Sequence, residues 1–271
     1  MIDLHCHMLP GIDDGAPELA VALVMARMAA ADGITTIACT PHIYPGLYEN
    51  TAAGIAIAID ALRNELAEAD IALELTVGAD TYLTPDLVEN LRSGRVPTLG
   101  GSRYFLLEPP HDVEPPRFEN AVFTTMAAGY VPVITHPERL TWIENRYAVF
   151  QRLARAGAWM QVTAGSVTGR FGQRPRYWAE RMLDEGFVHI LATDAHHSEW
   201  RPPLLAEARE IAARRLGTEE AMHLVITRPR CILDNREPME APVLPTGTAE
   251  LKGWRRLLSA WTGGVAPTRF S

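Results

Sequence analysis

Two pairs of side chains, far apart in the chain, have the types and the spacing of metal ligands. His5 and His7 are separated by one residue in a short segment, and side chains two residues apart in an extended segment lie on the same face. The same spacing recurs in Asp194 and His196, which follow the apolar run 190–192. Imidazole nitrogens and carboxylate oxygens together bind borderline divalent cations. The two segments therefore indicate a metal centre.

Five more side chains of the same kinds are spread along the chain. An isolated histidine beside a proline is more often structural, and an aspartate before a helix is often only a cap, so each of them indicates little alone. What they share is their position, because each follows a segment rich in β-branched and apolar residues. They are Asp14, His42, Asp80, Glu108 and His136.

Short apolar segments alternate with longer segments of helical period, which is the pattern of repeated βα units and a parallel sheet. Seven strands are expected, at residues 2–5, 34–39, 73–77, 104–107, 131–135, 159–163 and 189–193. Seven helices are expected, at residues 18–31, 52–69, 85–93, 117–128, 146–156, 175–185 and 203–215. Seven units that close on themselves make a barrel, so the predicted fold class is α/β, a seven-stranded (β/α)7 barrel.

All nine candidate ligands lie at or just after the carboxyl end of a predicted strand, which is where catalytic residues converge in parallel barrels. Strand 159–163 is the exception and offers Gln161, Thr163 and Ser166 without a strong ligand. Nine nitrogen and oxygen donors exceed the needs of one ion, so we expect a multinuclear centre of Mn, Fe, Co or Zn. The other histidines are expected to be structural or surface residues; they are His111, His189, His197 and His223.

Five motifs occur in order between residue 1 and about residue 235. They are His5-Cys6-His7-Met8-Leu9-Pro10-Gly11-Ile12-Asp13-Asp14-Gly15, Thr40-Pro41-His42, His136-Pro137-Glu138-Arg139, Asp194-Ala195-His196 and Arg201-Pro202-Pro203. In these motifs the sequence resembles the polymerase and histidinol phosphatase (PHP) superfamily and, within it, the bacterial tyrosine-protein phosphatases of capsular and exopolysaccharide synthesis. The resemblance implies a distorted seven-stranded barrel that holds three divalent metal ions, usually manganese.

The resemblance also implies how the ligands divide among the three ions. The implied sets are His5, His7 and Asp194 for one ion, Glu108 and His136 for a second, Asp80 as the bridge between these two, and Asp14, His42 and His196 for the third. The chain departs from the family at Gly78-Ala79-Asp80, where the family usually has glutamate in the third position. Aspartate is one methylene shorter, so the bridge must be made by a shorter side chain.

The expected reaction is hydrolysis of a phosphomonoester, because bound metals lower the pKa of water to about 7 and neutralise phosphoryl oxygens. Arg139 and Arg201 are the expected clamps on those oxygens, since a guanidinium matches phosphate geometry, and with His42 they are the candidate catalytic residues. A phenol, with a pKa of about 10, leaves more readily than an alkoxide, which favours phosphotyrosine. The resemblance implies a phosphotyrosine protein as substrate, such as a bacterial tyrosine kinase of polysaccharide export.

Three other interpretations stay open. An amidohydrolase also begins with His-x-His, but the only lysine is Lys252, so the carboxylated-lysine bridge of many such enzymes has no counterpart on a strand. A histidinol phosphatase would differ only in substrate, and Asp80 makes a catalytically impaired metal-binding regulator conceivable. Thiol-based tyrosine phosphatase chemistry is excluded because no Cys-x5-Arg motif occurs, and no Gly-x4-Gly-Lys phosphate loop occurs either.

Composition limits the location and the partners. A net charge of -8 over 271 residues argues against nucleic acid as a partner. The first residues lack the basic and apolar regions of a secretory signal, so a cytoplasmic location is expected. The expected division is a catalytic barrel at 1–235 and a tail at 236–271, where Leu251, Trp254 and Trp261 share one face of a short amphipathic helix. Membrane association is expected only through a partner, and the oligomeric state is not predicted.

Overall fold

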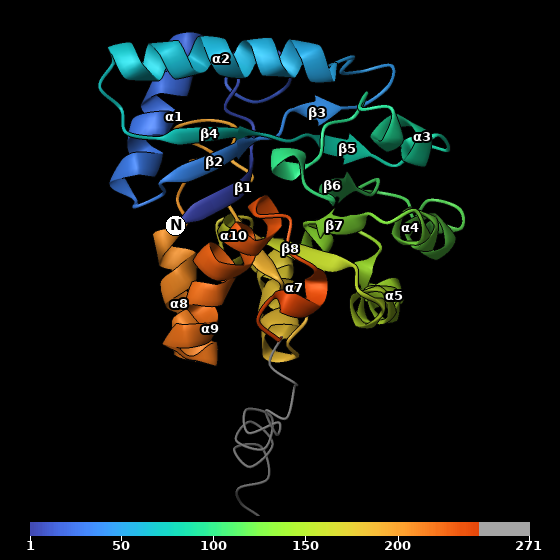
Figure 1. The fold of residues 1–271 in the computed structure, drawn as a ribbon. Helices are drawn as coiled ribbons and strands as arrows, with labels where there is room; N and C mark the ends of the chain where they lie inside the picture. Colours follow the sequence, from blue (N-terminus) through green and yellow to red (C-terminus); the bar gives the residue numbers. More distant parts are fainter. Residues whose placement is uncertain (244–271) are drawn as a thin grey trace, which may run out of the picture.

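The structure is a computed structural model and describes residues 1–243. Within these residues, nine strands form two sheets in which every pair of neighbours is parallel (Figure 1). The three-stranded sheet has the order β1 (Ile2–Cys6), β2 (Thr36–Cys39), β4 (Glu74–Val77). The six-stranded sheet has the order β3 (His42–Ile43), β5 (Asp80–Tyr82), β6 (Tyr104–Glu108), β7 (Val131–Thr135), β8 (Trp159–Thr163), β9 (Ile190–Ala192).

The seven expected strands are all present, but β3 and β5 were not predicted. β3 follows β2 after Thr40 and Pro41, and β5 follows β4 after Gly78 and Ala79. Proline has no N–H for a ladder hydrogen bond, and a Cβ on Gly78 would lie 2.9 Å from side chains of both Leu99 and Thr40. These residues let each strand stop and resume in the second sheet, so the observed arrangement is nine strands in two sheets rather than seven in one.

Hydrogen bonds beyond the ladders hold the end of β9 beside β1. The backbone N–H of Asp194 donates to the carbonyl of His5 at 2.8 Å, and that of His7 donates to the carbonyl of Ala195 at 2.8 Å. The buried carboxylate of Asp3 accepts a further bond from the backbone N–H of Thr193 at 3.0 Å. The first and last strands thus lie next to each other, which brings their carboxyl ends together.

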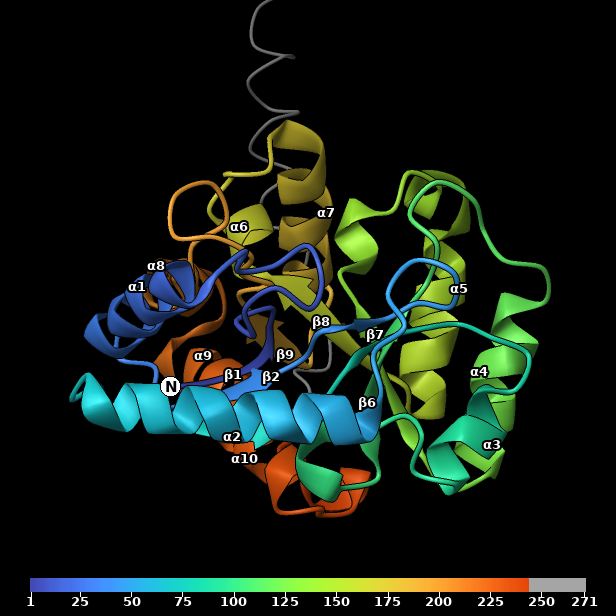
Figure 2. The same cartoon turned by 90° about the horizontal axis from the view of Figure 1, so that it is seen from above.

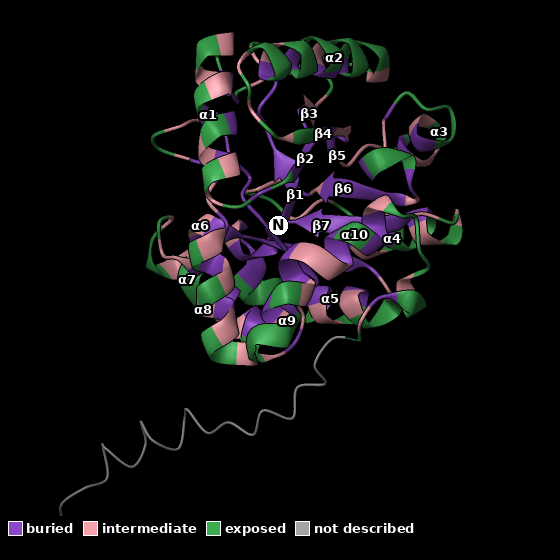
Figure 3. Ribbon diagram, turned by 60° about the vertical axis from the view of Figure 1, so that its left-hand side comes forward, coloured by how far each residue is buried: buried purple, intermediate pink, exposed green. Residues whose placement is uncertain are grey.

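The helices lie outside the strands (Figure 2). In α2 the buried residues Ile55, Ile59, Leu62 and Leu66 recur at helical spacing, so one side of the helix packs on the core and the other faces solvent (Figure 3). The Thr51 hydroxyl accepts the N–H of Gly54 and caps its start. The longer helices are α1 (Leu19–Ala31), α2 (Ala52–Glu68), α3 (Leu87–Arg92), α4 (Phe118–Ala127), α5 (Ile143–Ala156), α7 (Gln173–Asp184) and α8 (Ala206–Leu216).

These seven helices correspond to the predicted ones, whereas the helical turns after α8 were missed. They are α9 (Thr218–Met222), a π-helical turn (His223–Thr227) and α10 (Arg228–Leu233). Cys231 lies in α10 and is buried. Arg228 is 1% exposed and pairs with Glu220, and it also donates to the carbonyls of Pro242 and Val243. Pro242 and Val243, which follow residue 235, therefore contact α10.

The division at residue 235 and the cytoplasmic location stay predictions. The amphipathic helix expected around residues 251–261 lies outside the described residues. Among residues 1–243, no helix has the length and apolar character needed to cross a membrane.

Candidate metal centre

The structure brings all nine predicted ligands together at the carboxyl ends of the strands. They fall into overlapping groups in which donor atoms lie within 4.8 Å of one another. The groups are His7-Asp14-His42-His196, His5-His7-Asp80, His5-His136-Asp194, Glu108-His111-His136 and His42-Asp80-Glu108. Six of the predicted ligands belong to two groups each, so the groups form one continuous cluster rather than separate sites; they are His5, His7, His42, Asp80, Glu108 and His136.

His5 lies at the centre of the first part of this cluster. Its Nε2 atom is 3.1 Å from Nε2 of His7, 3.3 Å from Oδ2 of Asp80 and 3.4 Å from Oδ1 of Asp194. All four side chains are 0–2% exposed. These atoms face one another across distances that suit a shared cation, because a metal–ligand bond of about 2.0–2.2 Å places neighbouring ligand atoms about 3 Å apart.

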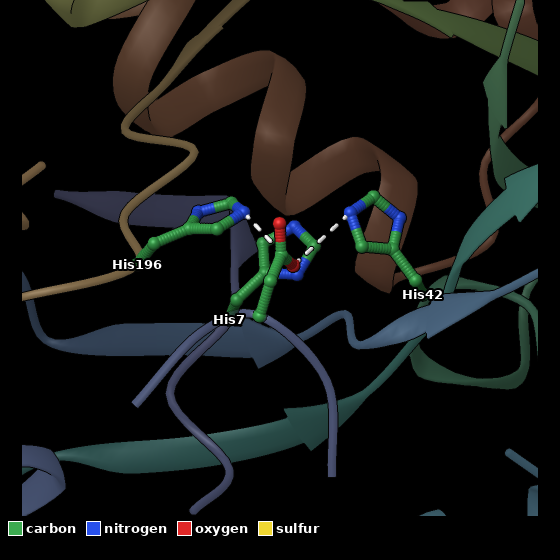
Figure 4. A group of neighbouring side chains, drawn as sticks. His7, His42 and His196 are labelled. Atoms are coloured by element: carbon green, nitrogen blue, oxygen red, sulfur yellow. Dashed lines mark ion pairs between the residues drawn. The ribbon is translucent and has the colours of Figure 1, made fainter. Parts of the chain in front are cut away.

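Asp14 connects two further histidines. Its Oδ1 atom is 3.4 Å from Nε2 of His42 and 3.5 Å from Nε2 of His196. Figure 4 shows His196 and His42 on either side, with His7 between them. The His7 ring lies 3.9 Å from the His196 ring and 4.5 Å from the His42 ring, measured between centroids. Three imidazoles and one carboxylate therefore surround a second small volume.

Glu108 lies at the centre of the third part of the cluster, which also contains His111, a residue that was not predicted as a ligand. Its carboxylate lies 3.3 Å from Nδ1 of His42 and 3.7 Å from Nε2 of His136. His111, expected to be structural or on the surface, lies with its Nε2 3.6 Å from the same carboxylate and its ring 4.8 Å from that of His136. Its position three residues after Glu108, beyond two prolines, was the only available signal.

Asp80 provides the test of whether cations fit this arrangement. Both of its carboxylate oxygens are buried and have no hydrogen-bond donor among the described residues, and the residue is 1% exposed. An uncompensated buried carboxylate is strongly unfavourable, and coordination to a cation removes that cost. Oδ2 of Asp80 lies 3.3 Å from Nε2 of His5 and 3.7 Å from Nδ1 of His42, so the shorter side chain still reaches between two groups of donors.

Hydrogen bonds on the far side of the rings orient three of the histidines. Nδ1 of His5 is 2.9 Å from Oε1 of Gln161, and Nδ1 of His7 is 2.8 Å from Oδ2 of Asp13. Nδ1 of His196 is 3.0 Å from the carbonyl of Asp194. Each acceptor favours the tautomer that carries its proton on Nδ1, which leaves the Nε2 lone pair directed into the cluster. Asp13 and Gln161 are therefore functional residues whose roles were not recognised in the sequence.

The backbone at two strand ends adopts a conformation that non-glycine residues rarely occupy. His136 has φ of 34° and Asp194 has φ of 51°, both in the left-handed region. His136 directly follows β7, and Asp194 lies two residues after the end of β9. The chain turns at both positions and carries the two side chains into the cluster. Strain of this kind persists where the surrounding structure requires a particular side-chain position.

The two predicted clamps lie beside the cluster and bind one of its members. Oδ2 of Asp194 accepts a hydrogen bond from Arg139 and forms an ion pair with Arg201 at 2.5 Å, while Oδ1 faces the histidines. The Phe171 ring lies under both guanidinium groups, at 5.0 Å from Arg139 and 5.9 Å from Arg201. Burial raises the pKa of Asp194, but the positive charges of Arg201, His5 and Arg139 outweigh it and hold that pKa well below its usual range.

The cluster also creates a strongly negative local potential. Burial lowers the pKa of His5, but the charges of Asp194 and Asp80 outweigh it and raise the pKa to about 9. Burial likewise lowers the pKa of His42, yet the carboxylates of Glu108, Asp80 and Asp14 raise it to about 10. Burial and neighbouring positive charges instead lower the pKa of His7 and His136. The carboxylates around His5 and His42, which favour a proton there, also favour other cations.

Most of the cluster is shielded from solvent. The Asp14 side chain is 47% exposed, whereas the other eight predicted ligands have side chains no more than 12% exposed. His111, at the other edge, is 36% exposed. The cluster is therefore most exposed to solvent at Asp14 and at His111.

The fold and the site define an α/β protein with a candidate multinuclear metal centre at the carboxyl ends of parallel strands. The family described as "Capsular polysaccharide synthesis, CpsB/CapC" matches residues 1–234. The chain therefore belongs to this family, which confirms the resemblance found in its motifs.

Individual relatives cover nearly the whole chain. The tyrosine-protein phosphatase YwqE of Bacillus subtilis is 32% identical over 254 residues, which is 94% of this chain and 100% of the relative. The tyrosine-protein phosphatase CpsB of Streptococcus agalactiae is 29% identical over 244 residues, which is 87% of this chain and 99% of the relative. Both alignments thus cover most of this chain and nearly all of each relative.

Solved structures agree with the fold. A crystal structure from work on YwqE from Bacillus subtilis and CpsB from Streptococcus pneumoniae, described as metal-dependent tyrosine phosphatases, superposes with a TM-score of 0.84 at 33% identity. The match covers 88% of this chain and 96% of that one. A hydrolase of Acinetobacter baumannii, 16% identical with a TM-score of 0.50, shares the fold alone.

The contact between Asp13 and His7 generates a first prediction. Replacing Asp13 with alanine removes the acceptor for Nδ1 of His7, and we expect divalent metal affinity to fall by about 10- to 100-fold, the usual effect of losing such a support. Asp13→Asn, which retains an uncharged acceptor, should lose less. Competition with a chelating dye measures the affinity.

The matched control for this prediction is Asp60→Ala, because Asp60 is an exposed aspartate on α2 whose recorded ion pair is with Arg63. Its metal affinity should equal that of the parent. Unchanged affinity in Asp13→Ala would show that Asp13 does not orient a metal ligand.

Proposed function

We propose that this protein is a metal-dependent phosphomonoesterase that hydrolyses phosphotyrosine in proteins and acts in the control of capsular or exopolysaccharide synthesis. The observation that carries the proposal is the buried Asp80 carboxylate, which lacks a donor among residues 1–243 and lies among histidines directed at it. The family and the names of the relatives support the choice of substrate. A phosphorylated bacterial tyrosine kinase is the protein substrate that we propose.

We propose three divalent ions, with manganese first and Fe, Co or Zn as alternatives, since nitrogen and oxygen donors suit all of them. His5, His7 and Asp194 would hold one ion, Glu108 and His136 a second with Asp80 between the two, and Asp14, His42 and His196 the third. Distances of 3.1 Å for His5–His7, 3.4 Å for His5–Asp194 and 3.7 Å for His7–Asp194 support the first set, and the distance of 3.7 Å for Glu108–His136 supports the second. The third set lies within one group of donor atoms, together with His7. His111 lies close enough to Glu108 and His136 to complete the second set.

The nine strands are best interpreted as a seven-stranded barrel in which two strands are interrupted. Backbone hydrogen bonds across both interruptions support this interpretation: Gly78 donates to Cys39 at 3.1 Å, and Asp80 donates to Pro41 at 3.1 Å. The bonds between the end of β9 and β1 supply the closure. In such a barrel the carboxyl ends of the strands form one reaction face.

When bound, the metals lower the pKa of water and neutralise charge on phosphoryl oxygens. The protein's own part is to position the phosphoryl group and to exclude bulk water. Nε of Arg201 is buried without an acceptor among the described residues, so it has a donor free for a phosphoryl oxygen. Arg139, 20% exposed on the same carboxylate, can contribute a second guanidinium from its accessible side.

Turnover of three compounds tests the proposal, measured as phosphate release from the two phosphomonoesters and as ring opening of a dihydropyrimidine. The purified, metal-loaded protein should hydrolyse a phosphotyrosine peptide faster than histidinol phosphate and should leave a dihydropyrimidine intact. His136→Ala, which removes a ligand that is 2% exposed, should abolish turnover while the fold is retained in circular dichroism. Preference for histidinol phosphate, or ring opening of the dihydropyrimidine, would overturn the assignment.

Arg139 gives a separate prediction. Arg139→Ala should lower turnover of an aryl phosphate by about 10²- to 10³-fold, typical of losing one stabiliser of transition-state charge. Arg139→Lys should recover only part of the loss, because an ammonium group cannot make the two-pronged contact. Metal content is measured on the same samples, since Arg139 also binds Asp194. Metal loss in proportion to activity would instead make Arg139 a support for that ligand.

A further inference from the structure

Two aromatic side chains flank the exposed side of the cluster without being ligands. Tyr48 stacks on His42, with ring centroids 5.5 Å apart and planes inclined by 13°. Trp200 lies near His196, with centroids 6.5 Å apart. His42 and His196 both face the exposed Asp14, one from each side (Figure 4). The two aromatic rings therefore lie next to the two histidines that contact Asp14, the most exposed of the predicted ligands.

Trp200 is the more informative of the two because its exposure has a cost. It is 55% exposed, which makes it a large apolar surface that the fold leaves in contact with water. Its ring is nonetheless held in place, because it stacks on His197 with centroids 5.3 Å apart and planes inclined by 18°. An exposed aromatic side chain with a fixed orientation beside an active site is typical of a binding surface.

The loop that carries Trp200 is closed by its own hydrogen bonds. The carbonyl of Arg201 accepts the backbone N–H groups of His196 at 3.0 Å and His197 at 3.2 Å. This turn places Trp200 directly before Arg201, whose guanidinium binds Asp194. Trp200 and Arg201 therefore belong to one hydrogen-bonded loop, in which Trp200 lies near His196 and Arg201 pairs with Asp194.

The loop that carries Tyr48 is similarly fixed. Tyr44 and Tyr48 exchange backbone hydrogen bonds of 3.0 Å and 2.8 Å, and Tyr44 stacks on Tyr82 with centroids 4.0 Å apart. Gly46 makes the tight turn between them, with φ of 84°. The Tyr48 ring is thus fixed over His42 by a short hairpin that is itself packed against β5.

We propose that Trp200 and Tyr48 form an aryl wall that binds the aromatic ring of a phosphotyrosine and so selects aryl over alkyl phosphomonoesters. This inference rests on the proposed function, because it requires a phosphoryl group at the metal centre. The wall adds ring contacts to a site whose remaining groups, imidazoles, carboxylates and guanidiniums, recognise only the phosphoryl part. Selection for the aryl group then comes from contact area as well as from the leaving group.

Calorimetric binding of two anions to the metal-loaded full chain tests the wall without turnover. Phenylphosphonate carries the ring and inorganic phosphate does not. Trp200→Ala should weaken phenylphosphonate about three- to tenfold, the range for one aromatic contact, while phosphate binding and metal content stay at parent values. Trp200→Phe should restore most of the loss, and Tyr48→Ala should act in the same direction. Phe123→Ala is the matched control, because Phe123 is an exposed aromatic residue on α4.

The outcomes separate the wall from the function on which it rests. If the parent binds neither anion, the phosphatase assignment fails and the wall fails with it. If the parent binds both, but Trp200→Ala weakens both equally or changes neither, the wall is wrong and the assignment stands. Loss of metal in Trp200→Ala would also overturn the wall, because it would make Trp200 a support for His196.

Discussion

The structure depends on one electrostatic constraint: several carboxylates and imidazoles are packed together where water cannot solvate them. Asp80 and Asp194 are 1% exposed, and the histidines between them are nearly as buried. Burying such charges costs several kcal/mol each unless opposite charge compensates them. Asp194 receives part of that compensation from Arg139 and Arg201, whereas Asp80 has no donor in the part of the chain that the structure describes. We propose that divalent cations supply the positive charge that the side chains leave unbalanced.

The fold meets this constraint by bringing parallel strands to a common edge. β1 and β9 are joined through His5, His7 and the residues after β9, so ligands from both ends of the sequence meet. Interrupting β4 after Val77 lets Asp80 sit at the start of a new short strand beside β3. A left-handed backbone at His136 and Asp194 completes the convergence. The strain at those residues is the cost of directing side chains inward at the strand ends.

Much of this arrangement could be predicted because strand ends and ligand types are both visible in a sequence. The apolar runs before His136 and Asp194 place those residues at strand ends, and their positions relative to β7 and β9 follow from that alone. The motifs indicated the family, and the match over residues 1–234 confirmed it. Strands β3 and β5 were missed because two or three residues carry no periodicity. The turns from Thr218 to Leu233 were missed because their π-helical segment breaks the helical repeat.

Other features could not be predicted because they depend on contacts between distant segments. The orientation of His5 comes from Gln161, which is 156 residues away in the chain. His111 gave only a weak local signal, and its contacts with Glu108 at the end of β6 and with His136 after β7 form only on folding. The same holds for Phe171, whose contact with two arginines joins separate loops. Sequence patterns indicate which chemistry is available, whereas tertiary contacts decide how each group is held.

The number of metal ions that the cluster binds is measured most directly by elemental analysis of the full chain. The chain is purified without added metal and then dialysed against manganese. We expect about three divalent ions per chain, because one ion cannot satisfy donors spread from Asp14 to Glu108. The parallel sample of Asp80→Ala should retain fewer ions, since it lacks the carboxylate between two groups of donors. A parent protein that binds less than about one ion per chain after loading would show that these side chains do not form a multinuclear metal centre.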